Sequence, residues 1–257
     1  MRKKPRILIV DIESIPDLPE ALKVWPQLSD FPGRTLKATI NSIACFGYRV
    51  HGSGESKVLC AWDYPEWEVD VNDDRRLVRD AARILRTADI IVTQNGDRFD
   101  LPFIQTRLMK NKLSRLPEIF SIDTKKEARR QMSAFSNSLK YLAEQFTDTE
   151  KMENEGWPLW VKVHGRDPLA MQTMRTYCGQ DLAATEALFD VLRPGIKRFP
   201  NMNQFFLEGD RCPNCGSQTL KKRGTRLLVE REVQRLQCMT CGKWSNQTVR
   251  GLVKGNT

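Results

Sequence analysis

The sequence lacks the features of a membrane or secreted protein. It contains no run of about 18 apolar residues, the length needed to cross a bilayer. The basic start MRKKPR leads into an apolar run that is too short for a signal peptide and that ends in acidic residues. Internal repeats and low-complexity tracts are also missing. We therefore expect a cytoplasmic protein with no membrane partner.

Disulfides are not expected, although the chain has 7 cysteines. Four of them form two C-x-x-C pairs near the C-terminus, and in a reducing compartment such pairs indicate a metal site before disulfides. The four are Cys212, Cys215, Cys238 and Cys241. Two thiolate pairs of this spacing predict one structural Zn²⁺ in a zinc ribbon, with a β-hairpin between the pairs. The remaining cysteines, Cys45, Cys60 and Cys178, are interpreted as small buried apolar residues.

Positive charge is concentrated in the same C-terminal part. The formal net charge is +9, and the region after residue 210 holds most of it. We expect three parts: a nearly neutral domain over 1–200, a linker over 201–210 and a basic zinc ribbon over 211–257. A basic module indicates a polyanionic partner. Its candidate nucleic-acid contacts are Lys221, Lys222, Arg223 and Arg226; a folding role or a protein contact is the alternative for the ribbon.

The larger part has the pattern of an α/β domain. After a first strand, an irregular Pro-rich stretch runs from Ser14 to about Ala38, and TINSIACFGYRV and ESKVLCAWD then form a predicted hairpin. Helices and strands alternate afterwards, and the last predicted helix is MQTMRTYCGQDLAATEALFDVL. Three early strands followed by alternating elements predict a mixed sheet flanked by helices.

Acidic residues recur where these elements place them together. Asp11 and Glu13 follow the apolar strand Arg6 to Val10 and, two residues apart, project from the same face of it. Asp100 lies just past a second apolar strand, at the start of a helix. Tyr177 and Asp181, four residues apart, share one face of the last helix. Asp123, at another strand end, is interpreted as a helix cap.

These segments resemble the three motifs of the DnaQ-like, or DEDD, 3′-5′ exonuclease superfamily, which has the ribonuclease H-like fold. The matches are VDIES, NGDRFD and Tyr-x-x-x-Asp, in that order, and the resemblance covers about residues 5 to 195. One branch of the family has a histidine five positions before the last aspartate. That position is Thr176 here, and neither His51 nor His164 has the spacing, so the chain resembles the tyrosine branch.

The resemblance implies a role for each matched residue. Asp11 would bridge two Mg²⁺ or Mn²⁺ ions, Glu13 and Asp181 would complete the site that activates water, and Asp100 would hold the second ion through water. Tyr177 would orient the attacking water, because its unperturbed pKa of about 10 makes it a poor base. Asn95 and Phe99 would shape the turn that supports Asp100.

We therefore expect a metal-dependent 3′-5′ exonuclease that acts on DNA, most readily on single strands or 3′ ends. A structure-specific endonuclease or a 3′-5′ exoribonuclease on the same fold is one alternative, and a non-catalytic nucleic-acid adaptor is another. DNA is the expected partner, with RNA as the other nucleic acid to test. A proofreading or repair role would add a replication or repair protein as a partner.

Overall fold

The structure is a computed structural model that describes residues 5–16, 41–149, 156–205, 210–229 and 231–248. Most of the expected Pro-rich stretch after the first strand lies outside these residues. Among the described helices, none combines the length and apolar character that a membrane crossing needs.

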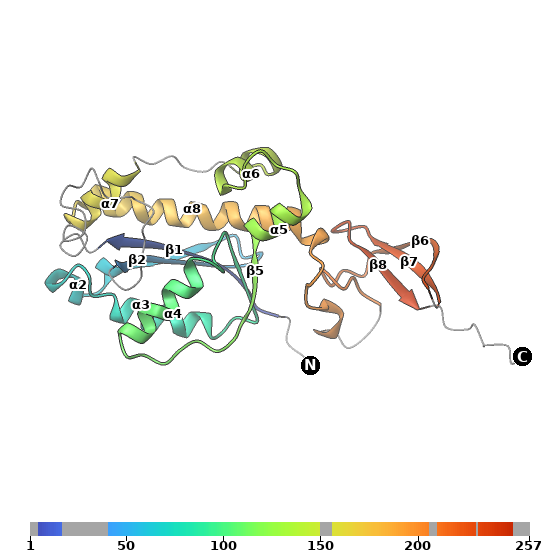
Figure 1. The fold of residues 1–257 in the computed structure, drawn as a ribbon, viewed down its shortest axis with the longest axis horizontal. Coiled ribbons are helices and arrows are strands. Elements are labelled where there is room, and N and C mark those ends of the chain that lie inside the picture. The colour runs from blue at the N-terminus through green and yellow to red at the C-terminus, as the bar shows by residue number, and fades with distance from the viewer. Residues whose placement is uncertain (1–4, 17–40, 150–155, 206–209, 230, 249–257) are drawn as a thin grey trace, which may run out of the picture. The chain divides into compact units, whose positions relative to one another are not determined.

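The chain divides into two compact units. The N-terminal unit spans Arg6–Val191, and the C-terminal unit contains the chain from Leu192 onward. Figure 1 shows the central sheet with its helices in the first unit and the three-stranded sheet in the second.

The N-terminal unit is built on a mixed sheet of five strands in the order β3-β2-β1-β4-β5. The strands β1, β2 and β3 pair antiparallel, whereas β4 and β5 run parallel to β1. This arrangement confirms the mixed sheet and the hairpin that the sequence predicts. The strands are β1 (Ile7–Pro16), β2 (Asn41–Val50), β3 (Ser56–Cys60), β4 (Ile90–Thr93) and β5 (Phe120–Asp123).

Helices cover both faces of this sheet (Figure 1). They are α2 (Glu66–Val69), α3 (Arg75–Leu85), α4 (Asp100–Lys110), α5 (Thr124–Gln131), α6 (Leu139–Phe146), α7 (Trp157–His164) and α8 (Pro168–Leu192). One apolar cluster joins β1 and β2 to α3 and α4 and contains Ile12. A second lies under α7 and α8 and contains Cys45, Cys60 and Cys178, so these cysteines are core residues, as expected.

The first strand is longer than the sequence indicates. It continues to Pro16, so Asp11 and Glu13 lie in its interior and not at its end. The reason is its two different neighbours: β2 pairs with β1 as far as Pro16, whereas the parallel pairing with β4 ends at Ile9. The two acids therefore lie in the part of β1 that pairs with β2 but no longer with β4.

The C-terminal unit contains a three-stranded antiparallel sheet in the order β6-β7-β8. Its strands and 3-10 helices are β6 (Leu220–Leu227), β7 (Glu232–Cys238), β8 (Trp244–Thr248), η3 (Arg193–Gly195) and η4 (Met202–Phe205). A register shift interrupts the pairing of β6 with β7 between Lys222 and Thr225. We call the part from residue 211 to residue 248 the cysteine ribbon.

Candidate functional site

Three carboxylates meet beside the middle of β1. One oxygen from each of Asp11, Glu13 and Asp181 lies within 4.8 Å of the other two. Glu13 is 9% exposed and Asp181 is 6% exposed, so both are largely removed from water. Carboxylate oxygens that converge in this way repel one another as anions, and a divalent cation offsets that repulsion. The donor set therefore fits Mg²⁺ or Mn²⁺.

The packing of α8 against β2 brings the third acid to the first two. Across the strands, Asp11 is paired with Gly47. A Cβ atom at residue 47 would lie 2.7 Å from Cys178 Sγ and 2.9 Å from Leu182 Cδ1. The helix thus packs directly on the backbone of β2, at a distance that a side chain would prevent, and Asp181 reaches β1. Gly47 was not predicted as a site residue from the sequence, although an isolated glycine inside a strand signals the close approach of another element.

Asp100 approaches β1 differently from the other acids. It is the first residue of α4 and is 3% exposed. Its Oδ1 accepts a hydrogen bond of 3.0 Å from the backbone N–H of Ile12, beyond the point where β4 stops pairing with β1. It does not belong to the group of three oxygens, but it is bonded to the residue between Asp11 and Glu13.

Burial sets the protonation of Asp100. It raises the pKa of this carboxyl to about 7; the N–H of Ile12 opposes the increase, and the negative charge of Asp123 adds to it. A buried carboxyl with this pKa changes its charge near neutral pH. Such a shift is typical of functional sites, although structural carboxyls show it as well.

The turn from β4 to α4 positions Asp100. Asn95 has a φ of 69°, a left-handed conformation that asparagine adopts more readily than most residues. A Cβ atom at Gly96 would lie 2.3 Å from Thr93 Oγ1, so glycine is required there. Phe99 is the N-cap residue of α4 and immediately precedes Asp100. The conformation of Asn95 agrees with the turn-forming role expected for it, whereas the supporting role of Phe99 stays a prediction.

Asp123 caps a helix, as expected from the sequence. Its Oδ1 accepts hydrogen bonds from the backbone N–H groups of Lys125 at 3.0 Å and Lys126 at 3.2 Å, at the start of α5. The same oxygen accepts from the N–H of Asn95 at 3.0 Å. Asp123 therefore links the start of α5 to the turn before Asp100.

Tyr177 lies one helical turn before Asp181 on α8 and is partly exposed. The residue between Tyr177 and Gly179 is Cys178, whose thiol is fully buried. Burial raises the pKa of Cys178, and the nearby carboxylates of Asp11 and Glu13 add to the increase. This thiol is therefore protonated and acts as a packing group beside the acids.

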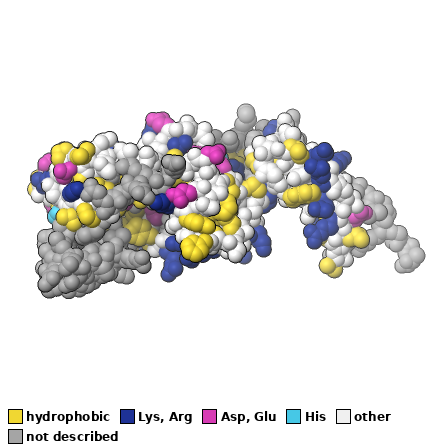
Figure 2. All heavy atoms as spheres, turned by 90° about the horizontal axis from the view of Figure 1, so that it is seen from above, with side chains coloured by type: hydrophobic (Ala, Val, Ile, Leu, Met, Phe, Trp, Pro, Cys, Tyr) yellow, Lys and Arg dark blue, Asp and Glu magenta, His cyan; other side chains and the backbone are white. Residues whose placement is uncertain are grey.

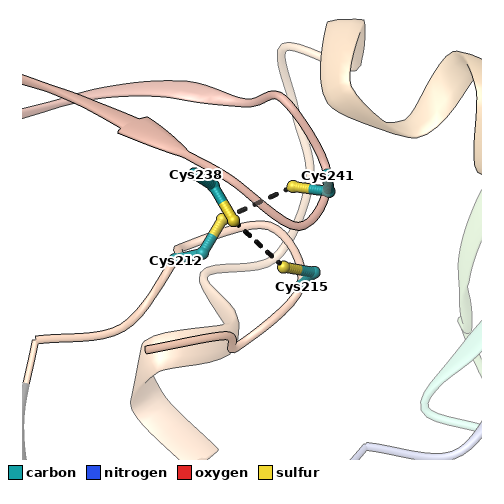
Figure 3. Close-up of side chains that lie close together, drawn as sticks. All are labelled: Cys212, Cys215, Cys238 and Cys241. Atoms are coloured by element: carbon teal, nitrogen blue, oxygen red, sulfur yellow. Dashed lines mark hydrogen bonds between the residues drawn. The ribbon is translucent and has the colours of Figure 1, made fainter. Parts of the chain in front are cut away.

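The four ribbon cysteines form a second cluster, in which one Sγ from each residue lies within 4.8 Å of the others. The Sγ atoms of Cys212 and Cys241 are 3.7 Å apart, and those of Cys215 and Cys238 are 3.6 Å apart (Figure 3). A disulfide needs about 2.0 Å. A zinc tetrahedron with bonds of about 2.3 Å has edges of about 3.8 Å. The spacing therefore fits a tetrahedral metal site.

Backbone and amide groups are directed at these thiols. Asn214 donates to Cys212 Sγ from its backbone N–H and to Cys241 Sγ from Nδ2, each at 3.4 Å. Burial raises the pKa of Cys238, but hydrogen bonds from the N–H groups of Cys241 and Thr240, together with those from the thiols of Cys215 and Cys212, outweigh it and lower that pKa to about 7. Donors of this kind stabilise thiolates, which are the form that binds metal.

A family model described as the RNase_H superfamily matches residues 34–193. The chain belongs to the RNase H superfamily. The matched stretch contains Asp100, Tyr177 and Asp181, whereas Asp11 and Glu13 precede it.

A solved structure has a fold similar to that of this RNase H superfamily chain. The family B DNA polymerase from the hyperthermophilic archaeon Pyrobaculum calidifontis matches with a TM-score of 0.55 and 16% identity. The match covers 75% of this chain and 26% of the polymerase, so the chain spans about a quarter of that protein's length. No match was found among curated protein sequences. The α/β, RNase H-like fold expected from the sequence is confirmed.

Proposed function

We propose that the N-terminal unit is a metal-dependent 3′-5′ exonuclease that hydrolyses DNA. The observation that carries the proposal is the group of carboxylate oxygens from Asp11, Glu13 and Asp181, within 4.8 Å of one another. Membership of the RNase H superfamily supports a nuclease. The order of the three motifs and the tyrosine at residue 177 support the DnaQ-like tyrosine branch, and with it the 3′-5′ direction.

The donor chemistry defines the cofactors of this proposal. Asp11, Glu13 and Asp181 offer oxygen atoms alone, which suit Mg²⁺ or Mn²⁺ better than softer metals. Asp100 completes the set of four acids. When bound, a pair of such ions supplies charge stabilisation for the attacking and leaving oxygens of a phosphodiester and lowers the pKa of water. The ribbon cysteines, in contrast, are proposed to hold one structural Zn²⁺.

Other residues of the chain position the acidic side chains and the attacking water. Ile12 anchors β1 in the apolar cluster under α3 and α4, so the side chains on either side of it project to the face covered by α8. Asp100 accepts the N–H of Ile12 and ties the second motif to the first. Tyr177, one turn before Asp181, is proposed to hydrogen-bond the attacking water and to orient it toward the phosphate.

The test uses the Asp181→Asn variant and a matched control on the same helix. Asp190 receives the same substitution, but its partner is His51, at 2.8 Å between Oδ1 and Nε2. A 5′-labelled single-stranded DNA should be shortened stepwise from its 3′ end in the presence of Mg²⁺. Asp181→Asn should abolish this shortening, Asp190→Asn should preserve it, and Tyr177→Phe should slow it while preserving metal dependence.

Substrates with other ends separate the alternatives. Cleavage of circular or 3′-blocked DNA would identify an endonuclease, and degradation of RNA alone would identify an exoribonuclease. Unchanged activity in Asp181→Asn would disprove the site. If wild-type protein binds nucleic acid but cleaves none of these substrates with Mg²⁺ or Mn²⁺, the adaptor function replaces the nuclease.

A further inference from the structure

The sheet of the cysteine ribbon has two chemically different faces. In an antiparallel sheet, paired residues project to the same face and alternate residues along a strand share it. Lys221 pairs with Gln237, and Gln237 pairs with Trp244 on the next strand. These three side chains therefore lie on one face, which we call the Trp244 face.

The register assigns three further cations to the Trp244 face. Arg235 is two residues from Gln237 on β7, so it shares that residue's face. Arg223 is two residues from Lys221, and its Nε donates to Gln237 Oε1 at 3.0 Å. Arg226 would fall on the opposite face by simple alternation from Arg223. The register shift between Lys222 and Thr225 inserts one residue, and Arg226 pairs with Val233, on the side of Arg235.

Lys222 belongs to the opposite face. It pairs with Leu236, which is buried, as is Cys238, two residues farther along β7. Glu232, the one acidic residue within the three strands, pairs with Leu227. By alternation along β7 from Leu236, its side chain also projects to this second face. The Trp244 face thus contains Lys221, Arg223, Arg226 and Arg235 and receives no acidic side chain from these strands. Figure 2 shows Lys and Arg side chains gathered on the ribbon.

Trp244 adds an exposed aromatic surface to these cations. It is 46% exposed, and the guanidinium carbon of Arg235 lies over its ring at 4.5 Å from the ring centroid. The contact with Arg235 orients the ring beside the cations by cation–π attraction. An aromatic side chain among phosphate-binding cations is the combination by which proteins bind unpaired nucleic acid, because bases stack on the ring and cations neutralise the backbone.

We propose that the Trp244 face binds a single-stranded segment of nucleic acid, with Lys221, Arg223 and Arg226 at the phosphates and Trp244 stacked on a base. The charge of the face is complementary to this ligand, and the open ring gives a reason to favour unpaired over paired strands. The inference rests on the proposed function only in taking nucleic acid as the ligand. Its test measures binding and not cleavage, so the two can fail separately.

Neighbouring lysines provide the matched test. Lys221→Gln and Lys222→Gln remove the same charge from adjacent positions on opposite faces. Both are made in the full chain carrying Asp181→Asn, without added Mg²⁺, so that the ligand stays intact. Anisotropy of a labelled single-stranded DNA, the same sequence as RNA, and a duplex is measured across a salt series.

We expect Lys221→Gln to weaken single-strand binding several-fold and to reduce the slope of log affinity against log salt by about 0.7, the value for one phosphate contact. Lys222→Gln should change the affinity less than twofold. Trp244→Ala should weaken single-strand binding by about tenfold to a hundredfold, and duplex binding far less. Trp244→Phe should restore most of the affinity, because it retains a ring.

Bound zinc, measured in every variant, verifies that the ribbon is folded. Equal losses for Lys221→Gln and Lys222→Gln would overturn the assignment to one face. An unchanged affinity in folded Trp244→Ala, or equal binding of duplex and single strand, would overturn base stacking. Failure of the parent protein to bind any of the three nucleic acids would overturn the proposal as a whole. Binding without cleavage by the wild type would overturn the exonuclease and leave the Trp244 face supported.

Discussion

The two units of the chain are stabilised by different means. The N-terminal unit buries large side chains such as Phe46 and Trp67 in the apolar cluster under α3 and α4, and a second apolar cluster lies on the other side of its five-stranded sheet. Among the described residues from Leu192 onward, the buried hydrophobic residues other than cysteine are Leu192, Ile196, Met202, Val233 and Leu236. Four thiols converge there instead. A small core is usually insufficient alone, and the proposed zinc would replace the missing burial.

This difference in core size suits the different roles proposed for the carboxylate site and for the ribbon. The carboxylates need fixed positions, and the large core supplies them through β1 and α8. In the proposed role, the basic ribbon strands need only to present charge and a ring to a flexible ligand, and a small sheet held by the proposed zinc would be able to do so. This comparison predicts that each unit can be disrupted while the other remains intact.

The largest expected effect is loss of the zinc proposed for the ribbon. Cys215→Ser removes one of four ligands, and structural zinc contributes about 10 kcal/mol or more to the folding of such modules. We expect the ribbon to unfold and the N-terminal unit to stay folded. Limited proteolysis should then degrade the C-terminal unit and leave a resistant fragment that ends near Val191. Parallel degradation of both units would show that their stabilities are coupled.

The reverse experiment removes a buried ion pair from the N-terminal unit. Asp74 accepts from Arg107 Nε and Nη2, each at 2.7 Å, and from the N–H of Ile43 at 2.9 Å. Asp74→Ala deprives the buried guanidinium of its carboxylate, and we expect a loss of about 3–5 kcal/mol in the free energy of unfolding. Urea denaturation measures it, while bound zinc should stay unchanged.

Asp80→Ala is the control for this change. Asp80 forms ion pairs with Arg79 and Arg83, whose side chains are 41% and 67% exposed. Exposed ion pairs of this kind contribute about 0–1 kcal/mol to the free energy of unfolding. A loss as large as that of Asp74→Ala would show that burial does not account for the difference.

The third expected effect is a change in the stability of the N-terminal unit with pH, caused by Asp100. The pKa of Asp100 is about 7 in the folded protein, against 3.8 as its ordinary value. The folded state therefore retains a proton that the unfolded state releases, and stability falls as pH rises from about 4 to about 7. Asp100→Asn cannot ionise and keeps the acceptor for Ile12.

Without added divalent cations, Asp100→Asn should therefore be more stable than wild type. The gain should be small near pH 4 and approach about 4 kcal/mol at pH 8, at 1.36 kcal/mol for each pKa unit. Urea denaturation along a pH series measures it, and Mg²⁺ should narrow the gap at pH 8. A gain that is equal at both ends of the series would contradict the ionisation of Asp100 as its cause.

The smallest effect concerns the packing of α8 on β2. Gly47→Ala forces a Cβ atom against Cys178 and Leu182, and overpacking of this kind costs about 1–3 kcal/mol. Because Asp181 moves with α8, we expect the variant to lose nuclease activity even under conditions in which it remains folded. Gly179→Ala is the control: its Cβ would lie 3.7 Å from Val58 Cγ2, and it should stabilise the helix by up to about 1 kcal/mol. Equal activity in both variants would contradict the packing argument.

The sequence predicted the features that depend on local pattern. Alternation along β1 placed Asp11 and Glu13 on one face, and the four-residue spacing placed Tyr177 and Asp181 on one side of α8. It did not predict that β1 continues to Pro16, because proline and serine are typical of turns and the pairing with β2 is a tertiary contact.

Features that arise between elements could not be predicted in the same way. The bond from Ile12 to Asp100 depends on where β4 ends, and no spacing in the sequence reports that point. In the ribbon, Lys221 and Lys222 are adjacent and looked equivalent. The register shift before Thr225 reverses the alternation that would otherwise assign the later residues to faces. The relation of Trp244 to these cations depends on the pairing of β8 with β7, which is also a tertiary contact.

The hydrogen bond from Ile12 to Asp100 also determines how an inactive form of this protein should be made. Replacing Asp100 by alanine removes a charge and, at the same time, the acceptor of a backbone N–H between two other acids. An inactive Asp100→Ala protein would therefore confound lost chemistry with a disturbed strand. Asp181 belongs to α8 and not to β1, so its conversion to asparagine gives the cleaner reference for crystallising or titrating a complex with intact substrate.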